Sequence, residues 1–187
     1  MYFSCFRVFV VAFFRELGEL CIQTPDFFIG SDGLRGPMHL FLVHHGDAVG
    51  PEVDARRPLS PVGELAVARA AADAAARGAR PTVVWHSGKL RARQTAEAFW
   101  RACNALAEFS ATRDLQPDDP PEWIRDRLRG ESRDVLIAGH YPHLPRLLTL
   151  LLTGRESTPV PFPQHGVVAL VTEDDADSWN ELWRIDI

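Results

Sequence analysis

Short apolar runs that end in polar residues or glycine predict buried strands at three places along the chain. These runs cover residues 39–43, 82–86 and 135–139. Each is too short for a typical helix and apolar at nearly every position, a pattern typical of strands that are covered on both faces of a sheet. Two later segments, at 167–172 and 182–187, are expected to add two closing strands.

Helical segments alternate with these strands. Ser60 is a good N-cap, Pro61 fits the first helical position, and the alanine-rich stretch that follows stops at Gly78, so a helix is predicted up to residue 77. Further helices are expected at 90–106, 122–129 and 144–152, and a proline- and aspartate-rich loop at 112–121. This alternation predicts an α/β fold, a three-layer αβα sandwich with a mainly parallel sheet.

The first 37 residues differ from the rest of the chain. Residues 2–14 are aromatic and β-branched, contain Arg7, and are too few to cross the roughly 30 Å of a bilayer's hydrocarbon core. The pattern of a secretory signal is missing as well, so we expect neither export nor membrane attachment. We interpret residues 1–37 as an N-terminal extension, either a non-native start or a poorly ordered segment, and residues 38–187 as one domain.

Composition and charge narrow the possible functions. The chain of 187 residues carries a formal net charge of -5, which gives no general attraction to nucleic acid or to an anionic membrane. Any recognition of phosphate must therefore be local. Its three cysteines are scattered without metal-ligand or disulfide spacing, which favours a reducing compartment and a cytoplasmic protein.

The candidate chemistry lies just after the three predicted buried strands. In open α/β sheets, ligands bind at the carboxyl edge of the strands. A nucleophile and cations for the equatorial oxygens are what phosphoryl transfer requires, and histidine and arginine supply both. The polar clusters at this edge are His44, His45, Gly46 and Asp47 after the first strand, His86, Ser87 and Arg91 after the second, and Gly139 and His140 after the third.

Four motifs in this order resemble the histidine phosphatase superfamily, which is phosphoglycerate mutase-like, and most closely its SixA-like phosphohistidine phosphatases. They are His45-Gly46, the Arg-Pro-Leu-Ser run at 57–60, the Leu-Arg-Ala-Arg-Gln-Thr run at 90–95, and Gly139-His140. The resemblance covers nearly everything from Met38 onward. It implies a phosphoglycerate mutase-like sandwich that works without a metal ion or other cofactor.

The resemblance also implies a role for each matching residue. His45 matches the nucleophile, which is phosphorylated during turnover. Arg57 and Arg91 match the two arginines that bind the phosphate oxygens, a task that suits the planar guanidinium. His140 matches the second histidine, which donates a hydrogen bond to the transferred group. Gly46 matches the glycine that lets the backbone come close to the nucleophile and hold its tautomer.

One residue departs from the pattern, because the superfamily has arginine where this chain has His44. Unlike arginine, histidine has an ordinary pKa of about 6.5 and is often neutral at pH 7. Two interpretations stay open, a phosphate contact and a packed side chain. A weakened phosphate contact would cost about 1.5–3 kcal/mol. If His44 gains charge beside a phosphate dianion, activity should improve toward mildly acidic pH.

No carboxylate is predicted to serve as general acid, because Asp118 and Asp119 are typical of a turn. This favours a labile substrate with a good leaving group. We therefore expect a phosphohydrolase that removes phosphate from the phosphohistidine of a signalling or phosphotransfer protein. The alternatives are a small-molecule phosphatase and a catalytically weak module that binds phosphoproteins.

The remaining histidines allow another class of site. His44, His45, His86, His140 and His165 could together hold a transition metal, but their spacing is not that of a metal site, so no metal is expected. His86 and His165 are interpreted as structural and His143 as a surface residue. Ser87 and Thr95 are interpreted as capping or packing residues.

Overall fold

The computed structural model describes residues 36–155, 158–173 and 176–186. All but the last two residues of the expected extension, 1–37, lie outside these ranges. Within the described ranges, no helix is long and apolar enough to cross a membrane.

One six-stranded sheet forms the middle layer, in the order β3-β2-β4-β1-β5-β6. The pairs β1–β4, β2–β4 and β2–β3 are parallel, whereas β5 runs antiparallel to both β1 and β6. The prediction of a mainly parallel sheet is confirmed. The strands are β1 Met38–His44, β2 Val83–His86, β3 Glu108–Ala111, β4 Val135–Gly139, β5 Val167–Thr172 and β6 Asn180–Ile185.

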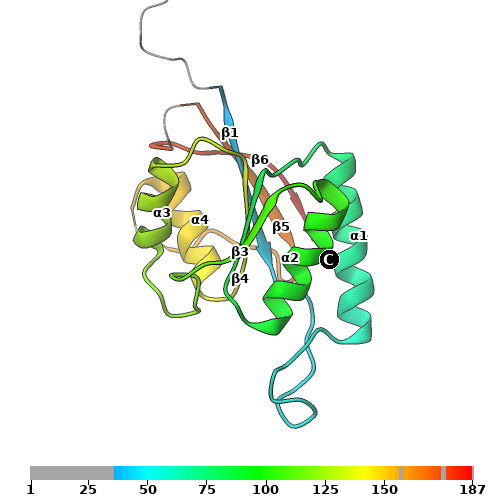
Figure 1. The fold of residues 1–187 in the computed structure, drawn as a ribbon. Helices are drawn as coiled ribbons and strands as arrows, with labels where there is room; N and C mark the ends of the chain where they lie inside the picture. Colours follow the sequence, from blue (N-terminus) through cyan, green and yellow to red (C-terminus); the bar gives the residue numbers. More distant parts are fainter. Residues whose placement is uncertain (1–35, 156–157, 174–175, 187) are drawn as a thin grey trace, which may run out of the picture. The chain divides into compact units, whose positions relative to one another are not determined.

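Two helices cover each face of this sheet (Figure 1). The helices α1 Pro61–Ala76 and α2 Leu90–Cys103 pack together on one face, and α3 Pro121–Arg129 packs with α4 His143–Thr153 on the other. The predicted three-layer sandwich is therefore confirmed. Ser60 caps α1 by accepting a hydrogen bond from the Gly63 amide at 3.0 Å, as its position before Pro61 predicts.

The central strand β1 shows why the sequence lacks a polar–apolar alternation. Leu40 and Leu42 pack into the core on the α3 and α4 side, while Phe41 and Val43 pack into the core on the α1 and α2 side. All four are buried. A strand that is covered on both faces needs apolar residues at every position.

The segment after α2 differs from the prediction. The helix ends at Cys103, and Asn104 turns the chain through bonds from its Nδ2 to the Pro81 carbonyl and from the Leu106 amide to its Oδ1. The chain then forms β3, which was not predicted. None of the four residues of this edge strand is fully buried, so it lacks the apolar run that marked the other parallel strands.

The sheet register brings the three polar clusters to one edge. His44 pairs with Gly139, and His86 pairs with Ala138 in the neighbouring parallel pair. The residues that follow β1, β2 and β4 therefore leave the sheet side by side. The long loop between β1 and α1 extends from the same edge, in cyan in Figure 1.

Candidate active site

His45 lies just past the end of β1 with its ring held from both sides. Its Nδ1 donates to the Gly46 carbonyl at 2.8 Å, and the Arg91 Nε donates to its Nε2 at 3.0 Å. A carbonyl oxygen only accepts and a guanidinium only donates, so Nδ1 carries the proton and Nε2 keeps its lone pair. The electron pair that could act as a nucleophile is thus on Nε2, where it accepts the bond from Arg91.

The electrostatic surroundings keep this ring neutral. Burial lowers the pKa of His45 to about 4; the hydrogen bond to Gly46 opposes the shift, and the positive charge of Arg91 adds to it. At neutral pH the Nε2 of His45 is therefore unprotonated, as nucleophilic attack requires.

Gly46 is required by close packing. A Cβ at this position would lie 2.4 Å from the Val67 Cγ2, so any side chain would push the loop away from α1. The Gly46 amide donates to the Thr95 Oγ1 at 3.1 Å, and that hydroxyl donates to the Arg91 carbonyl at 2.8 Å. Thr95, which was interpreted as a capping or packing residue, thus ties the end of β1 to the turn of α2 that carries Arg91.

Arg57 approaches from the loop before α1. It adopts a left-handed backbone conformation with a φ of 50°, and its Nε donates to the Val49 carbonyl at 3.2 Å. Its positive charge lowers the pKa of both His45 and Arg91, which places it within electrostatic reach of the two. Of the two predicted arginines, Arg91 thus contacts His45 directly, and Arg57 acts on it through its charge.

His140 completes this cluster from the end of β4. Its ring centroid lies 5.0 Å from that of His45, and its Nε2 shares a hydrogen bond of 2.6 Å with the Ser87 Oγ. Burial lowers the pKa of His140 to about 2, with the His45 and Arg91 charges adding to the shift. Ser87 is itself fixed by Gln116, whose Nε2 donates to the Ser87 carbonyl at 2.8 Å.

His44 is buried beside His45, with 4.5 Å between the two ring centroids. Its Nδ1 accepts a hydrogen bond of 2.8 Å from the backbone amide of His165, so its proton is on Nε2. Burial lowers the pKa of His44 to about 3, and the neighbouring histidines add to the shift. His44 is therefore neutral at pH 7 in the site without substrate, and its expected gain of charge beside a phosphate dianion stays a prediction.

His165 belongs to this site, although the sequence interpretation made it structural. Its Nδ1 donates to the His45 carbonyl at 2.6 Å, and its ring stacks on that of His44 with 5.1 Å between centroids. The one sequence signal was its place directly before a closing strand. That strand, β5, pairs with β1 and brings residue 165 to the same edge.

The cluster suits an anion better than a cation. One ring nitrogen from each of His44, His45 and His165 lies within 4.8 Å of the others, a separation compatible with metal binding. However, ligation of a metal through the Nδ1 of His44 would break the bond from the His165 amide. Ligation through its Nε2 would require the loss of the one proton that the neutral ring carries. A cation at the Nε2 of His45 would also lie beside the positive charge of Arg91, whereas an oxyanion would be attracted to it. His86 lies apart from them and accepts from the Gly88 amide at 3.1 Å.

His143 corrects a sequence interpretation. It was interpreted as a surface residue, but the structure buries it completely within α4. The reason is that α4 is buried on most of its circumference, against α3 on one side and the sheet on the other. Asp119 does lie in a turn, where its carboxylate accepts from the Gln116 amide at 2.7 Å.

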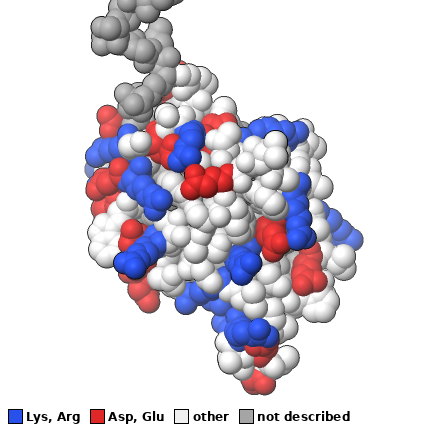
Figure 2. Space-filling model, viewed as in Figure 1, with Lys and Arg blue, Asp and Glu red and all other residues white. Residues whose placement is uncertain are grey.

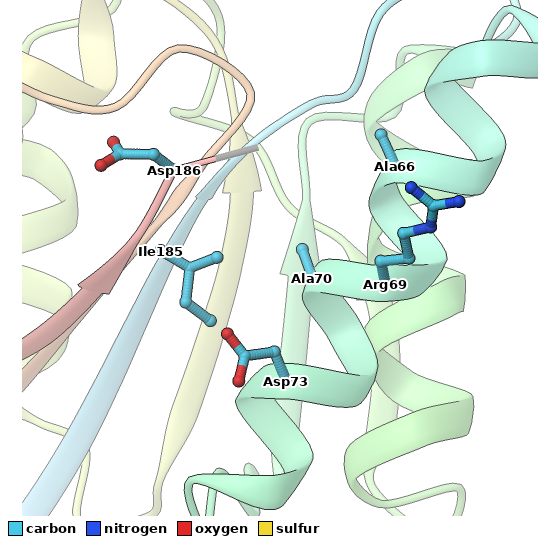
Figure 3. Close-up of a pocket in the computed structure, with 6 residues that line it drawn as sticks. All are labelled: Ala66, Arg69, Ala70, Asp73, Ile185 and Asp186. Atoms are coloured by element: carbon cyan, nitrogen blue, oxygen red, sulfur yellow. The ribbon is translucent and has the colours of Figure 1, made fainter.

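A separate cavity of about 340 Å³ lies between α1 and the end of β6 (Figure 3). Its lining shares no residue with the histidine and arginine cluster and contains neither histidine nor cysteine, so it offers no comparable chemistry. The lining consists of Ala66, Arg69, Ala70, Asp73, Ile185 and Asp186.

Comparison with known proteins supports the fold. No protein-family model matches the chain, and no curated protein matches it significantly. Among solved structures, the protein histidine phosphatase SixA in complex with tungstate is 24% identical with a TM-score of 0.70, covering 80% of this chain and 97% of its own.

Two further structures are similar. The SixA protein of Agrobacterium tumefaciens is 22% identical with a TM-score of 0.66, over 81% of this chain and 99% of its own. A phosphoglycerate mutase from Plasmodium falciparum is 16% identical with a TM-score of 0.60, over 79% and 90%. At these identities the similarity shows a common fold.

Proposed function

We propose that this chain, which has the phosphoglycerate mutase-like fold of the histidine phosphatases, is a metal-independent phosphohydrolase acting through a phosphohistidine intermediate on His45. Its proposed substrate is a phosphohistidine side chain of a signalling or phosphotransfer protein. The observation that carries the proposal is the state of His45, a neutral imidazole whose Nε2 lone pair is aligned by the Arg91 Nε at 3.0 Å.

The reaction takes two displacement steps at phosphorus. First, Nε2 of His45 attacks the phosphoryl group, the N–P bond of the substrate breaks, and the departing imidazole takes a proton from solvent. Second, water attacks the phosphorus, the N–P bond to His45 breaks, and phosphate leaves with the water's oxygen. Arg57, Arg91 and His140 stabilise the charge on the equatorial oxygens in both steps.

A phosphohistidine substrate is consistent with the carboxylates near the site, because Asp47 and Asp119 are both engaged in other hydrogen bonds. Asp47 is the carboxylate nearest to His45 in the sequence, and it accepts a hydrogen bond of 2.5 Å from the Ser60 hydroxyl. Asp119 is engaged in its own turn. Imidazole is a far better leaving group than an alkoxide, so a phosphoramidate needs less help from a general acid.

Phosphate release from a phosphohistidine protein and from an aryl phosphate, each measured with and without EDTA, tests the proposal. Wild type should release phosphate from the phosphohistidine protein faster. His45→Ala should lose release and labelling of the enzyme by ³²P, whereas His39→Ala, a change at the other end of β1, should keep both. Release that persists in His45→Ala, or that EDTA abolishes, would overturn the mechanism.

The absence of charge on His44 favours a second candidate, a module that binds phosphoproteins without turning them over. His44→Arg distinguishes the two. If wild type releases no phosphate and His44→Arg does, the natural chain is the binding module. If wild type releases phosphate and His44→Arg does so faster, the chain is an enzyme whose phosphate binding the histidine has weakened.

A further inference from the structure

A tight turn at residues 163–166 sits directly against the two histidines at the end of β1. The Gly166 amide donates to the Pro163 carbonyl at 3.1 Å, and His165 has a left-handed φ of 58°. A Cβ on Gly166 would lie 2.3 Å from the Ile185 carbonyl oxygen, so the turn is packed against the end of β6. The shape of this turn is therefore strongly restrained.

Three hydrogen bonds join the turn to His44 and His45. The His44 amide donates to the Gly166 carbonyl at 3.0 Å, and the His165 amide donates to the His44 Nδ1 at 2.8 Å. The His165 Nδ1 donates to the His45 carbonyl at 2.6 Å. The His44 and His165 rings stack with an interplanar angle of 16°.

These bonds determine what His44 can offer to a ligand. Because its Nδ1 accepts from a backbone amide, which cannot change roles, His44 is held as the tautomer that carries its proton on Nε2. It then presents one neutral N–H donor beside the nucleophile, whose ring centroid is 4.5 Å away. Tyr141 restrains the ring further with an edge contact at 4.6 Å.

We propose that His44 donates a neutral hydrogen bond from Nε2 to the phosphoryl group on His45, and that His165 is the positioning residue that maintains this tautomer. The inference rests on the proposed function and extends it to a residue outside the four motifs. It gives a physical reason why histidine can stand at position 44: the donor is kept, although the charge is not.

Two substitutions at His165 separate the contribution of its backbone conformation from that of its side-chain hydrogen bond. His165→Gly allows the left-handed conformation but loses the ring, its stacking on His44 and its bond to the His45 carbonyl, so the backbone amide of residue 165 is no longer held against the His44 Nδ1. His165→Asn also tolerates that conformation and retains an amide N–H that can donate to the same carbonyl. Gln164→Gly, an exposed position in the same turn, is the matched control.

The first readout is the tautomer of His44, measured by ¹⁵N NMR of the ring in the free protein. Wild type, His165→Asn and Gln164→Gly should show a single tautomer protonated on Nε2, and inorganic phosphate should shift its N–H signal. His165→Gly should show a mixture of tautomers and a smaller shift. Phosphate release should fall about tenfold in His165→Gly, as for one weakened bond to a charged group, and recover in His165→Asn.

The possible outcomes distinguish a failure of the positioning role of His165 from a failure of the proposed hydrolysis. A wild-type His44 protonated on Nδ1, or a His165→Gly protein with unchanged tautomer, would overturn the positioning role. Loss of release in His165→Asn with an intact tautomer would also overturn it, since His165 would then act by proton transfer. A fixed tautomer and a phosphate-induced shift without any phosphate release would leave the positioning intact and overturn the proposed hydrolysis.

Discussion

The imidazole of His45 should remain the reactive form well below neutral pH, because burial lowers its pKa to about 4. A lowered histidine pKa means that the neutral form persists above that pH and is lost as the pH falls through it. We expect phosphate release from an aryl phosphate, corrected for the ionisation of the substrate, to be level from pH 8 to about pH 5 and to fall below it. A pH–rate profile of kcat/KM measures this.

The same profile separates His44 from His45. Activity that rises from pH 7 to pH 5.5 would contradict this prediction, because it would require a group with an ordinary histidine pKa to become charged. His44→Arg is the useful comparison, since its guanidinium stays charged and its profile should report His45 alone.

His143 should make the fold sensitive to acid. It is fully buried, neither ring nitrogen has a hydrogen-bond partner among the described residues, and burial lowers its pKa to about 4. Its contribution to stability is complete above the unfolded pKa of about 6.5 and is lost as the pH falls toward 4, because the unfolded chain binds the proton more tightly. Relative to neutral pH, the loss at pH 5 should be about 2 kcal/mol.

Urea unfolding of wild type and His143→Leu at pH 7 and pH 5 tests this prediction. The variant should lose less stability than wild type between the two pH values. The loss of stability due to protonation of His44, His45 and His140 on unfolding is the same in both proteins. An equal loss in the two proteins would show that His143 does not bind the proton on unfolding. A neutral leucine fits the apolar surroundings of α4 and keeps the side-chain volume similar.

At the level of elements, one hydroxyl couples a strand to a helix. Thr95 accepts from the Gly46 amide and donates to the Arg91 carbonyl, and it is fully buried. Thr95→Val preserves the shape but leaves the Gly46 amide unpaired, so unfolding free energy should fall by about 1–3 kcal/mol. Phosphate release should fall as well, because the loop that holds His45 is no longer tied to α2.

Thr95→Ser is the matched control, since it keeps the hydroxyl and removes a methyl group. It should retain more phosphate release than Thr95→Val, although it leaves a small cavity. Equal activity in the two variants would mean that the coupling between β1 and α2 does not depend on this hydroxyl.

The elements that could be predicted from the sequence are those with local signals. Ser60 and Pro61 mark the start of α1, and the apolar run 135–139 marks β4, because capping and double-sided burial depend on neighbouring residues alone. The strand β3 lacked such a signal, since its four residues pair only at an exposed edge. The exact end of α2 depended on the bond between Asn104 and Pro81, which are distant in sequence.

The residues of the candidate site also fall into those with a local sequence signal and those that depend on long-range packing. His45 and Arg91 could be selected because their motifs follow predicted strands or begin a helix. His165 could not, because its role depends on an antiparallel pairing that no local pattern announces. The burial of His143 was missed because it depends on what packs around α4, and the tautomer of His44 depends on a backbone amide contributed by another part of the chain.

Taken as a whole molecule, the chain is acidic, so the affinity of its site for anions must come from a few local cations. On the face seen in Figure 2, basic and acidic side chains are interspersed. A bound oxyanion should therefore stabilise the entire fold through Arg57 and Arg91. At 100 times its Kd, inorganic phosphate should add about 2.7 kcal/mol to the free energy of unfolding.

Thermal unfolding with and without phosphate measures this linkage. Arg91→Ala should lose most of the stabilisation, whereas Arg93→Ala, which removes an exposed cation two residues along α2, should keep it. Equal stabilisation of the two variants would place the anion elsewhere on the molecule.

The position of β1 between β4 and β5 has a consequence for the order in which the molecule forms. The bond from the His165 amide to His44 spans 121 positions, and the antiparallel partner of β1 lies near the end of the sequence. Contacts of this separation carry a large loop-closure cost and form late. During synthesis His45 therefore emerges long before the segment that holds its neighbour His44, and we expect the candidate site to be complete only after β5 has paired with β1.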